Sequence, residues 1–481
     1  MTNEVQLPFW SPRSYQKTGV KLMLSQACAG LLYKPGLGKT AVVYMAFRIL
    51  QEKGYVDKAL VICPIRPMWN VWPNQKDTYA DFQHLRVGVM HGKGKQEVLE
   101  SDDYDLYIIN PEGLAWLFNV TMEEYVTAGG KQKKRPKFDK HRLTFLKDKF
   151  PMLVVDESTE FRNSDTNRFK ILKEGIKAFK RRYIMTGTPM PKTLMDLFGQ
   201  MYILDEGDAL GRFITHYRTK YFYPDPAIEF GWLPQPGAME RVSKRIAKLC
   251  QVVEVKGNIE LPEIVYDDIW VTLPPDARIR YDAMHESLVA LVQSGAVIAA
   301  NAAVASSKCR QIANGALYHS EVAGEYTPIH EEKIAALKGL VAELQGDPVL
   351  ITYEFQFDRD ALADLGIPSI STGSAQADSA NIKRFQRGEL PAVMGHPKSI
   401  SLGIDGLQDS CCHIAMFGVT WNLLHYEQVI DRIRRSGNKS KTVVVHRILA
   451  KNTVDSRVLE VLDGRDRNQQ SFMGLLNRLG R

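Results

Sequence analysis

A glycine-rich segment near the start of the chain has the residue types that hold a nucleotide phosphate. Pro35-Gly36-Leu37-Gly38-Lys39-Thr40 follows an apolar run at residues 30–33 and precedes a helical pattern at residues 41–50. In this setting glycines let backbone N–H groups approach phosphates, and the helix N-terminus adds positive potential. We predict that Pro35 to Gly38 wrap the phosphates of ATP, that Lys39 reaches the β- and γ-phosphates, and that Thr40 binds Mg²⁺.

One position departs from the full phosphate-loop pattern. G-x-x-x-x-G-K-[ST] requires glycine at residue 33, where this chain has Tyr33. A chance turn with the same letters is the competing interpretation. The expected strand before the segment and the helix after it favour phosphate binding.

Two adjacent carboxylates could supply the rest of the chemistry. Asp156 and Glu157 directly follow the apolar run Leu153-Val154-Val155. Carboxylates that emerge from a strand end lie at the ligand-binding edge of a parallel sheet. We predict that Asp156 holds Mg²⁺ and that Glu157 accepts a proton from the attacking water. Capping of the next helix is the simpler alternative for either residue alone.

A third pattern lies late in the chain. Gln428, Arg432 and Arg435 are spaced i, i+4 and i+7, which predicts that they share one face of a helix. Composition alone favours an ordinary basic helix face. The position after an expected strand and the aromatic turn Trp421-Asn422, in a chain with both nucleotide motifs, instead favours arginines that stabilise charge on a transferred phosphoryl group.

Size and composition limit the possible classes of protein. The 481 residues include 44% apolar residues and carry a formal net charge of +7, which fits about two to four folded domains and a polyanionic partner. The N-terminus lacks the pattern of a secretory signal, and no apolar run approaches the roughly 18 residues of a membrane span. Six cysteines without C-x-x-C spacing argue against a zinc site. We expect a cytoplasmic protein without a membrane partner.

Short β-branched runs alternate with helix-length segments in two stretches of the chain, which is typical of parallel sheets covered by helices. We therefore predict two α/β domains, at residues 1–204 and 333–481, with a mostly helical insertion and connector over residues 205–332. The expected strands are 30–33, 59–63, 106–110, 153–156 and 183–186 in the first domain, and 349–353, 391–394, 413–417 and 442–448 in the second.

A basic cluster interrupts the first domain. Residues 131–137, with the sequence KQKKRPK, follow Gly129-Gly130, which predicts an exposed loop. A solvated surface turn and a contact with a phosphate backbone are both open interpretations.

Together these motifs resemble helicase superfamily two, and within it the SWI/SNF-like translocases, including short bacteriophage members. The resemblance spans nearly the whole chain and implies two tandem RecA-like domains that close on ATP and Mg²⁺. Residues 11–16 are similar to the family's adenine-reading motif, which implies that Gln16 contacts the base with Tyr15 and Arg13 beside it. Thr159 stands where the family's Asp-Glu-Ala-His ends in histidine, so the coupling route to the second domain is open.

The resemblance also assigns roles to other segments. Residues 185–189 resemble the coupling motif through Thr186, Gly187 and Thr188. The fifth motif and the Q-x-x-x-R-x-x-R-x-G motif imply nucleotide contacts by Asp405 and Gln428, and an arginine-finger role for Arg432 and Arg435. Nucleic-acid contacts are implied for Pro64, Ile65, Arg66, Asn110, Pro111, Glu112, Thr352, Tyr353, His396, Lys398 and Ser399.

The predicted activity is ATP hydrolysis by a nucleic-acid motor. We expect a DNA-stimulated ATPase that translocates as a monomer on double-stranded or branched DNA, in replication, recombination or repair. DNA fits better than RNA, replication or recombination proteins are candidate partners, and a phage-encoded chain would act in the bacterial host cytoplasm. A strand-separating DNA or RNA helicase is the alternative, and an ATP-switched DNA clamp or strand annealer is the alternative of another class.

Overall fold

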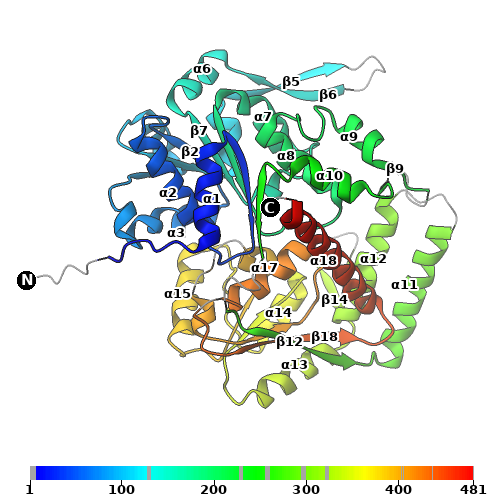
Figure 1. Cartoon of the computed structure of the whole chain (residues 1–481). Coiled ribbons are helices and arrows are strands. Elements are labelled where there is room, and N and C mark those ends of the chain that lie inside the picture. Colours follow the sequence, from blue (N-terminus) through cyan, green and yellow to red (C-terminus); the bar gives the residue numbers. More distant parts are fainter. Residues whose placement is uncertain are drawn as a thin grey trace, which may run out of the picture. The chain divides into compact units, whose positions relative to one another are not determined.

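The computed structural model describes residues 7–126, 132–226, 231–254, 260–293, 299–319, 324–401, 404, 406–435 and 437–479 (Figure 1). The chain divides into two compact units. The first comprises residues 1–223, 232–255 and 468–481, and the second comprises residues 224–231 and 256–467. The three-part division drawn from the sequence stays a prediction.

The first unit is built on a seven-stranded parallel sheet with the order β11-β1-β8-β7-β2-β4-β3. Its central strands are buried apolar runs, as expected for a sheet covered by helices on both faces. The strands are β1 (Cys28–Tyr33), β2 (Ala59–Ile62), β3 (Val87–Val89), β4 (Leu106–Ile109), β7 (Met152–Asp156), β8 (Arg181–Met185) and β11 (Cys250–Val253).

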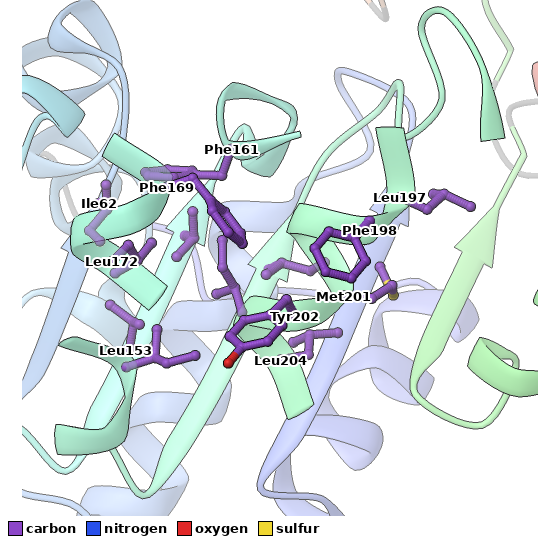
Figure 2. Close-up of a cluster of buried hydrophobic side chains, with 14 of the residues drawn as sticks. Ile62, Leu153, Phe161, Phe169, Leu172, Leu197, Phe198, Met201, Tyr202 and Leu204 are labelled. Atoms are coloured by element: carbon purple, nitrogen blue, oxygen red, sulfur yellow. The ribbon is translucent and has the colours of Figure 1, made fainter. Parts of the chain in front are cut away.

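Helices and an aromatic cluster close the core of the first unit. Figure 2 shows Phe169, Phe198 and Tyr202 gathered with Leu153 of β7. The Phe169 and Tyr202 rings meet edge to face with centroids 5.9 Å apart, a favoured aromatic geometry. The helices are α1 (Ser14–Ser25), α2 (Lys39–Glu52), α3 (Ile65–Asn70), α4 (Lys95–Glu100), α5 (Leu114–Leu117), α6 (Lys140–Lys149), α7 (Asn167–Gly175), α8 (Leu197–Asp205), α9 (Ile214–Tyr221) and α10 (Ala238–Ile246).

The second unit has a five-stranded parallel sheet with the order β12-β18-β17-β15-β16. The strands are β12 (Glu263–Val271), β15 (Val349–Thr352), β16 (Ala392–Gly395), β17 (His413–Met416) and β18 (Thr442–Ala450). The helices are α11 (Pro275–Gln293), α12 (Ala299–Asn314), α13 (Glu332–Glu343), α14 (Gln356–Asp364), α15 (Ala375–Gln386), α16 (Pro397–Ser401), α17 (Leu423–Ile433) and α18 (Val454–Leu479), whose last part belongs to the first unit.

The two parallel sheets confirm the predicted fold class of two tandem RecA-like α/β domains. Every strand expected from the sequence is present, with ends shifted by a residue or two. The connector contains α9 to α12 and, in addition, β11 and β12, which were not predicted and which join the first and second sheets respectively. Short pairs also form between β9 (Phe222–Pro224) and β10 (Trp232–Pro234), and between β13 (Ala316–Tyr318) and β14 (Tyr326–Pro328).

The predicted loop at the basic cluster is wrong. Residues 132–138 form the strand β6 (Gln132–Phe138), which pairs antiparallel with β5 (Val120–Val126). A regular ladder of cross-strand partners outweighs the low strand propensity of lysine and proline in this segment. Among the described residues, no helix is both long and apolar enough to cross a membrane.

Candidate nucleotide site

The loop between β1 and α2 has the backbone of a phosphate cradle. Gly36 and Gly38 have φ values of 80° and 73°, in the left-handed region that favours glycine. Gly38 is the N-cap of α2, so Lys39 and Thr40 are its first two residues and the helix N-terminus faces the loop. A Cβ added at Gly36 would meet no atom within 4 Å, so space is open there for a ligand. The geometry fits a bound anion.

Tyr33, which replaces the expected glycine, has a core function. Its ring is fully buried, and its hydroxyl lies 2.5 Å from Oε1 of Gln251 and 3.4 Å from the Tyr15 carbonyl oxygen. Burial raises the pKa of Tyr33 far above its ordinary value. A Cβ at Gly19 would come within 2.3 Å of the Tyr33 hydroxyl, so glycine there makes room for it. The Tyr33 carbonyl accepts a 2.9 Å hydrogen bond from the Lys39 ammonium.

The residues of the predicted adenine motif contact the same loop. The Tyr15 hydroxyl and the Gln16 side-chain amide both donate to the Leu37 carbonyl, over 3.3 and 3.2 Å. Gln16 Oε1 also accepts from the Arg13 backbone N–H at the start of α1. A Cβ at Gly38 would lie 2.5 Å from the Gln16 amide nitrogen. The segment 13–16 and the loop are therefore packed together.

Asp156 ends β7 with a fixed carboxylate. The residue is 8% exposed, and its Oδ2 accepts a 3.0 Å hydrogen bond from the indole N–H of fully buried Trp72. Its Oδ1 accepts from the backbone N–H of Glu157, which has left-handed backbone angles of 50° and 52°. A non-glycine residue in this conformation carries strain that is common at functional sites. Burial, with a smaller contribution from Asp156, raises the pKa of the nearby Cys63 thiol well above its ordinary value.

Sheet register brings the loop and the carboxylates to one edge. Met185 of β8 is the partner of Leu31 on β1 and of Asp156 on β7. The carboxyl ends of these adjacent parallel strands thus lie side by side. Ligands bind at this edge of open α/β sheets.

Thr159 and the coupling motif form a closed ring of hydrogen bonds. The hydroxyl oxygens of Thr159 and Thr186 are 2.7 Å apart, Thr159 donates to the Thr188 carbonyl over 3.1 Å, and the Thr188 N–H donates to the Thr186 hydroxyl. Because each hydroxyl has one hydrogen, Thr186 must donate to Thr159. All three residues are buried. A Cβ at Gly187 would lie 2.7 Å from Pro35 Cδ, so the coupling motif also abuts the phosphate loop.

The first two segments predicted to bind nucleic acid follow neighbouring strands. Pro64 is the N-cap of α3, which contains Ile65 and Arg66, after β2; Ile65 is 43% exposed. After β4, the Asn110 amide donates to Glu112 over 2.8 Å beside buried Pro111. Since β2 and β4 pair in parallel, the two segments share the carboxyl edge of the sheet.

The corresponding residues of the second unit gather at the ends of β15 and β16. Thr352 and Tyr353 are buried, and the Tyr353 ring meets His396 edge to face at 5.9 Å. The Ser371 hydroxyl oxygen lies 3.0 Å from the Tyr353 hydroxyl oxygen and accepts a hydrogen bond from the backbone N–H of His396. Burial lowers the pKa of His396. The remaining residues of the set, Lys398 and Ser399, lie on α16.

The predicted helix face with three convergent residues is only partly correct. Gln428 and Arg432 lie on α17, whose N-cap is Asn422, but the helix ends at Ile433. Arg435 therefore lies in the turn beyond the C-cap, where its N–H donates to the Ile433 carbonyl and its Nε donates to the Asp431 carbonyl. The C-cap, Arg434, has ψ of 73° and breaks the helical spacing. Asp405 lies outside the described residues.

Two residues that support the site were missed in the sequence. Trp72 had a usable signal, because a buried indole N–H needs an acceptor and few acceptors lie in a core. Gln251 had none. It comes from β11, donates to the Tyr15 carbonyl over 3.0 Å and accepts from Tyr33, a link that depends on an unpredicted strand pairing.

Several known proteins are similar to this chain. The SWI2/SNF2 ATPase core of Sulfolobus solfataricus, solved in complex with dsDNA, aligns with a TM-score of 0.43 and 19% identity over 98% of this chain and 96% of that one. Protein p41 of Acyrthosiphon pisum secondary endosymbiont phage 1 is 27% identical over 94% of this chain and 95% of its own length.

Longer relatives match as well. An uncharacterized ATP-dependent helicase of Mycoplasma pneumoniae is 25% identical over 94% of this chain, which spans 41% of that protein. A DNA repair and recombination protein RAD54-like of Danio rerio is 20% identical over 92% of this chain and 63% of its own length. The SNF2-related domain matches residues 15–297, more than half of the chain. The chain therefore belongs to the SNF2-related, SWI/SNF-like branch of helicase superfamily two, and it is an ATP-hydrolysing helicase or translocase.

Proposed function

We propose that the protein is a DNA-stimulated ATPase that translocates on double-stranded or branched DNA, remodelling it by branch migration, fork reversal or displacement of bound proteins. The observation that carries this proposal is the ring of Thr159, Thr186 and Thr188 beside the phosphate loop. The ring links the turn after the carboxylates to the coupling motif that follows the neighbouring strand. In a motor such a link would carry a change at the carboxylates to the coupling motif, so that nucleotide state changes the shape of the domain.

The nucleotide is held by residues of the first unit. Lys39 exchanges the Tyr33 carbonyl for the phosphates of ATP, and the N–H groups at the start of α2 bind phosphate oxygens. Thr40 and the fixed carboxylate of Asp156 fit Mg²⁺, a hard cation that prefers oxygen ligands. When bound, the ion neutralises phosphate charge. Glu157 accepts the proton of the attacking water, and Gln16 with Tyr15 and Arg13 reads the base.

The second unit contributes positive charge. Arg432 and Arg435 stabilise the charge that develops on the transferred phosphoryl oxygens, and Gln428 assists nucleotide binding. The motif containing these residues supports the assignment, although Arg435 lies beyond the helix.

DNA is the proposed track. The Danio rerio relative is named for DNA repair and recombination and aligns over most of this chain, which supports DNA over RNA. The sites at the carboxyl edges of both sheets, from Pro64 and Asn110 to His396 and Lys398, would bind the backbone. A strand-separating helicase is the second candidate, favoured by the name of the Mycoplasma relatives.

One comparative assay tests these activities. ATP turnover is measured with duplex, single-stranded, forked and four-way DNA and with RNA, alongside displacement of a third strand from duplex. We expect the duplex to stimulate turnover most and the third strand to be displaced. Unwinding of forks without displacement would favour the helicase, and absence of stimulation by any nucleic acid would reject the motor.

Two variants separate binding from chemistry in the same assay. Lys39→Ala is expected to lose nucleotide binding, because the ammonium is removed from the phosphate loop. Glu157→Gln is expected to bind ATP normally while turnover falls by about 10²-fold or more, as is typical when a general base is removed. Normal turnover in Glu157→Gln would exclude this residue as the base.

A further inference from the structure

The strands β5 and β6 lie outside the seven-stranded sheet of the first unit. The two seven-residue strands of this β5–β6 hairpin pair from Val120 with Phe138 to Val126 with Gln132, and they form a sheet separate from the large one. The root is fixed to the domain. Phe138 packs on Phe118 with ring centroids 6.0 Å apart, and the Asn119 amide donates to Asp139 over 2.9 Å.

The same carboxylate anchors the next helix. Asp139 accepts from the backbone N–H groups of His141 and Arg142 at the N-terminus of α6. The hydrogen bond from Asn119, together with these N–H groups, lowers the pKa of Asp139. These contacts therefore fix the base of the hairpin to the first unit.

One face of the hairpin carries cations beside an aromatic ring. Paired residues of an antiparallel ladder share a face, so Arg135 and Lys137 lie with their partners Glu123 and Thr121, and with Tyr125. Arg135 and Lys137 have side-chain exposures of 62% and 67%. The guanidinium of Arg135 lies 5.5 Å from the centre of the Tyr125 ring.

Charge on this face is poorly balanced. A single carboxylate, Glu123, pairs with both cations, at 3.1 Å from Arg135 and 3.9 Å from Lys137. The segment 132–138 contains no acidic residue. Exposed ion pairs contribute little to stability, so the cations are available to an anionic partner.

We propose that this face of the hairpin is a second DNA contact, which binds the phosphate backbone of duplex DNA outside the motor core. The proposal rests on the proposed function, since DNA is the partner. Successive same-face residues on a strand are about 6.7 Å apart, which lets Arg135 and Lys137 bind separate phosphates of an extended backbone. The contact carries no base readout, so it adds affinity without sequence preference.

Charge-neutral substitutions test the contact. Arg135→Gln/Lys137→Gln is expected to weaken duplex binding and to reduce the slope of log K against log salt concentration by about 0.9 for each phosphate that the protein no longer neutralises. ATP turnover without DNA is expected to stay unchanged. Fluorescence anisotropy with a labelled duplex over a salt series measures the slope.

A variant that is expected to strengthen duplex binding excludes misfolding as the cause of the effect. Glu123→Gln removes the carboxylate that competes for both cations, so we expect tighter duplex binding at the same salt concentration. The matched control is Arg384→Gln/Arg387→Gln, which removes two exposed cations that share Glu389 at 3.5 and 2.5 Å. This control is expected to leave the slope unchanged.

The outcomes are distinct. An unchanged slope in Arg135→Gln/Lys137→Gln, or an equal reduction in the control, overturns the hairpin contact while the motor stands if the parent protein is stimulated by DNA. If the parent neither binds nor responds to duplex DNA, the proposed function and the hairpin contact both fall.

Discussion

The hydroxyl of Thr186 donates a hydrogen bond to the hydroxyl of Thr159, with the two oxygens 2.7 Å apart in a buried site. Thr159 replaces the histidine of the family's Asp-Glu-Ala-His motif, a substitution that left the coupling route open. The structure connects the carboxylate strand end to the coupling motif directly, without an imidazole. Thr159 lies in the turn after β7, and its hydroxyl contacts the residue that directly follows β8.

Thr159→Val tests this connection. Valine keeps the shape but leaves the Thr186 hydroxyl and the Thr188 carbonyl without their present partner. We expect the free energy of unfolding to fall by about 1–3 kcal/mol, the usual cost of an unsatisfied buried polar group. If the ring couples DNA to hydrolysis, DNA-stimulated turnover falls more than basal turnover, and Thr159→Ser restores both. Equal loss of the two rates would mark the ring as purely structural.

Trp72→Phe tests how Asp156 is held. Phenylalanine preserves a buried aromatic ring but removes the donor to Oδ2. A hydrogen bond to a charged group contributes about 1.5–3 kcal/mol, which corresponds to roughly a ten- to hundredfold change in an equilibrium constant. We expect the Mg²⁺ concentration for half-maximal turnover to rise within that range. Binding of a fluorescent nucleotide in the absence of Mg²⁺ should not change, and a matching loss there would refute the assignment.

Tyr33→Gly restores the glycine of the phosphate-loop pattern and is nevertheless expected to harm the protein. The substitution removes a fully buried ring and its hydrogen bonds to Gln251 and Tyr15. Loss of a large aromatic side chain from a core costs about 3–5 kcal/mol. Thermal unfolding should show a large fall in Tm, whereas Tyr33→Phe should show a small one. A stable Tyr33→Gly protein with tighter ATP binding would contradict the core function.

Arg435→Ala and Arg434→Ala separate chemistry from structure within one turn. Arg434 Nε donates to the Pro262 carbonyl over 2.8 Å, a contact within the second unit. We expect Arg435→Ala to lose hydrolysis while nucleotide binding remains, and Arg434→Ala to lower Tm with smaller effects on turnover. Single-turnover kinetics and equilibrium nucleotide binding measure the difference. If Arg435→Ala loses binding first, the residue binds ground-state nucleotide.

Asp358 predicts a pH dependence of stability in the second unit. Complete burial raises the pKa of this carboxyl to about 7 despite hydrogen bonds from the Glu354 and Phe355 backbone. The folded state therefore binds more protons than the unfolded state between about pH 4 and pH 7. Its contribution to stability is full below that window and falls by up to about 1.4 kcal/mol for each pH unit as pH rises through it. Asp358→Asn should flatten this dependence in melts from pH 5 to pH 8, and identical slopes would disprove it.

The sequence predicted the elements whose signal is local. Short apolar runs followed by chemistry-bearing residues located β1, β7 and β8, together with the phosphate loop and Asp156. Pairings between distant segments carried no such signal. Tertiary packing determines the edge strand β11, the hydrogen bond that Trp72 donates and the hydrogen bonds of Gln251. A short segment of sequence does not contain that information. The β5–β6 hairpin was not predicted for a related reason. Its strands depend on cross-strand partners, which a single segment of sequence does not show.

The turn after α17 illustrates a different limit. Regular spacing predicted one helix face for Gln428, Arg432 and Arg435, yet the helix ends before Arg435. Spacing arguments hold only while the backbone keeps its period. Gly437, with φ of 102°, follows in a conformation that a helix does not allow, and it was a local sign of the ending.

The first unit is formed by three separate segments of the chain, which sets the order in which its parts emerge during synthesis. Until residue 253 has left the ribosome, β1 is an open sheet edge next to the phosphate loop, and exposed edges invite pairing with other chains. Phe472, Met473 and Leu476 of the same core emerge only after the second unit. Domains usually fold in order from the N-terminus. Here the ATP-binding domain is completed only after the whole second unit has been translated, and nascent chains depend on protection of the β1 edge until β11 emerges.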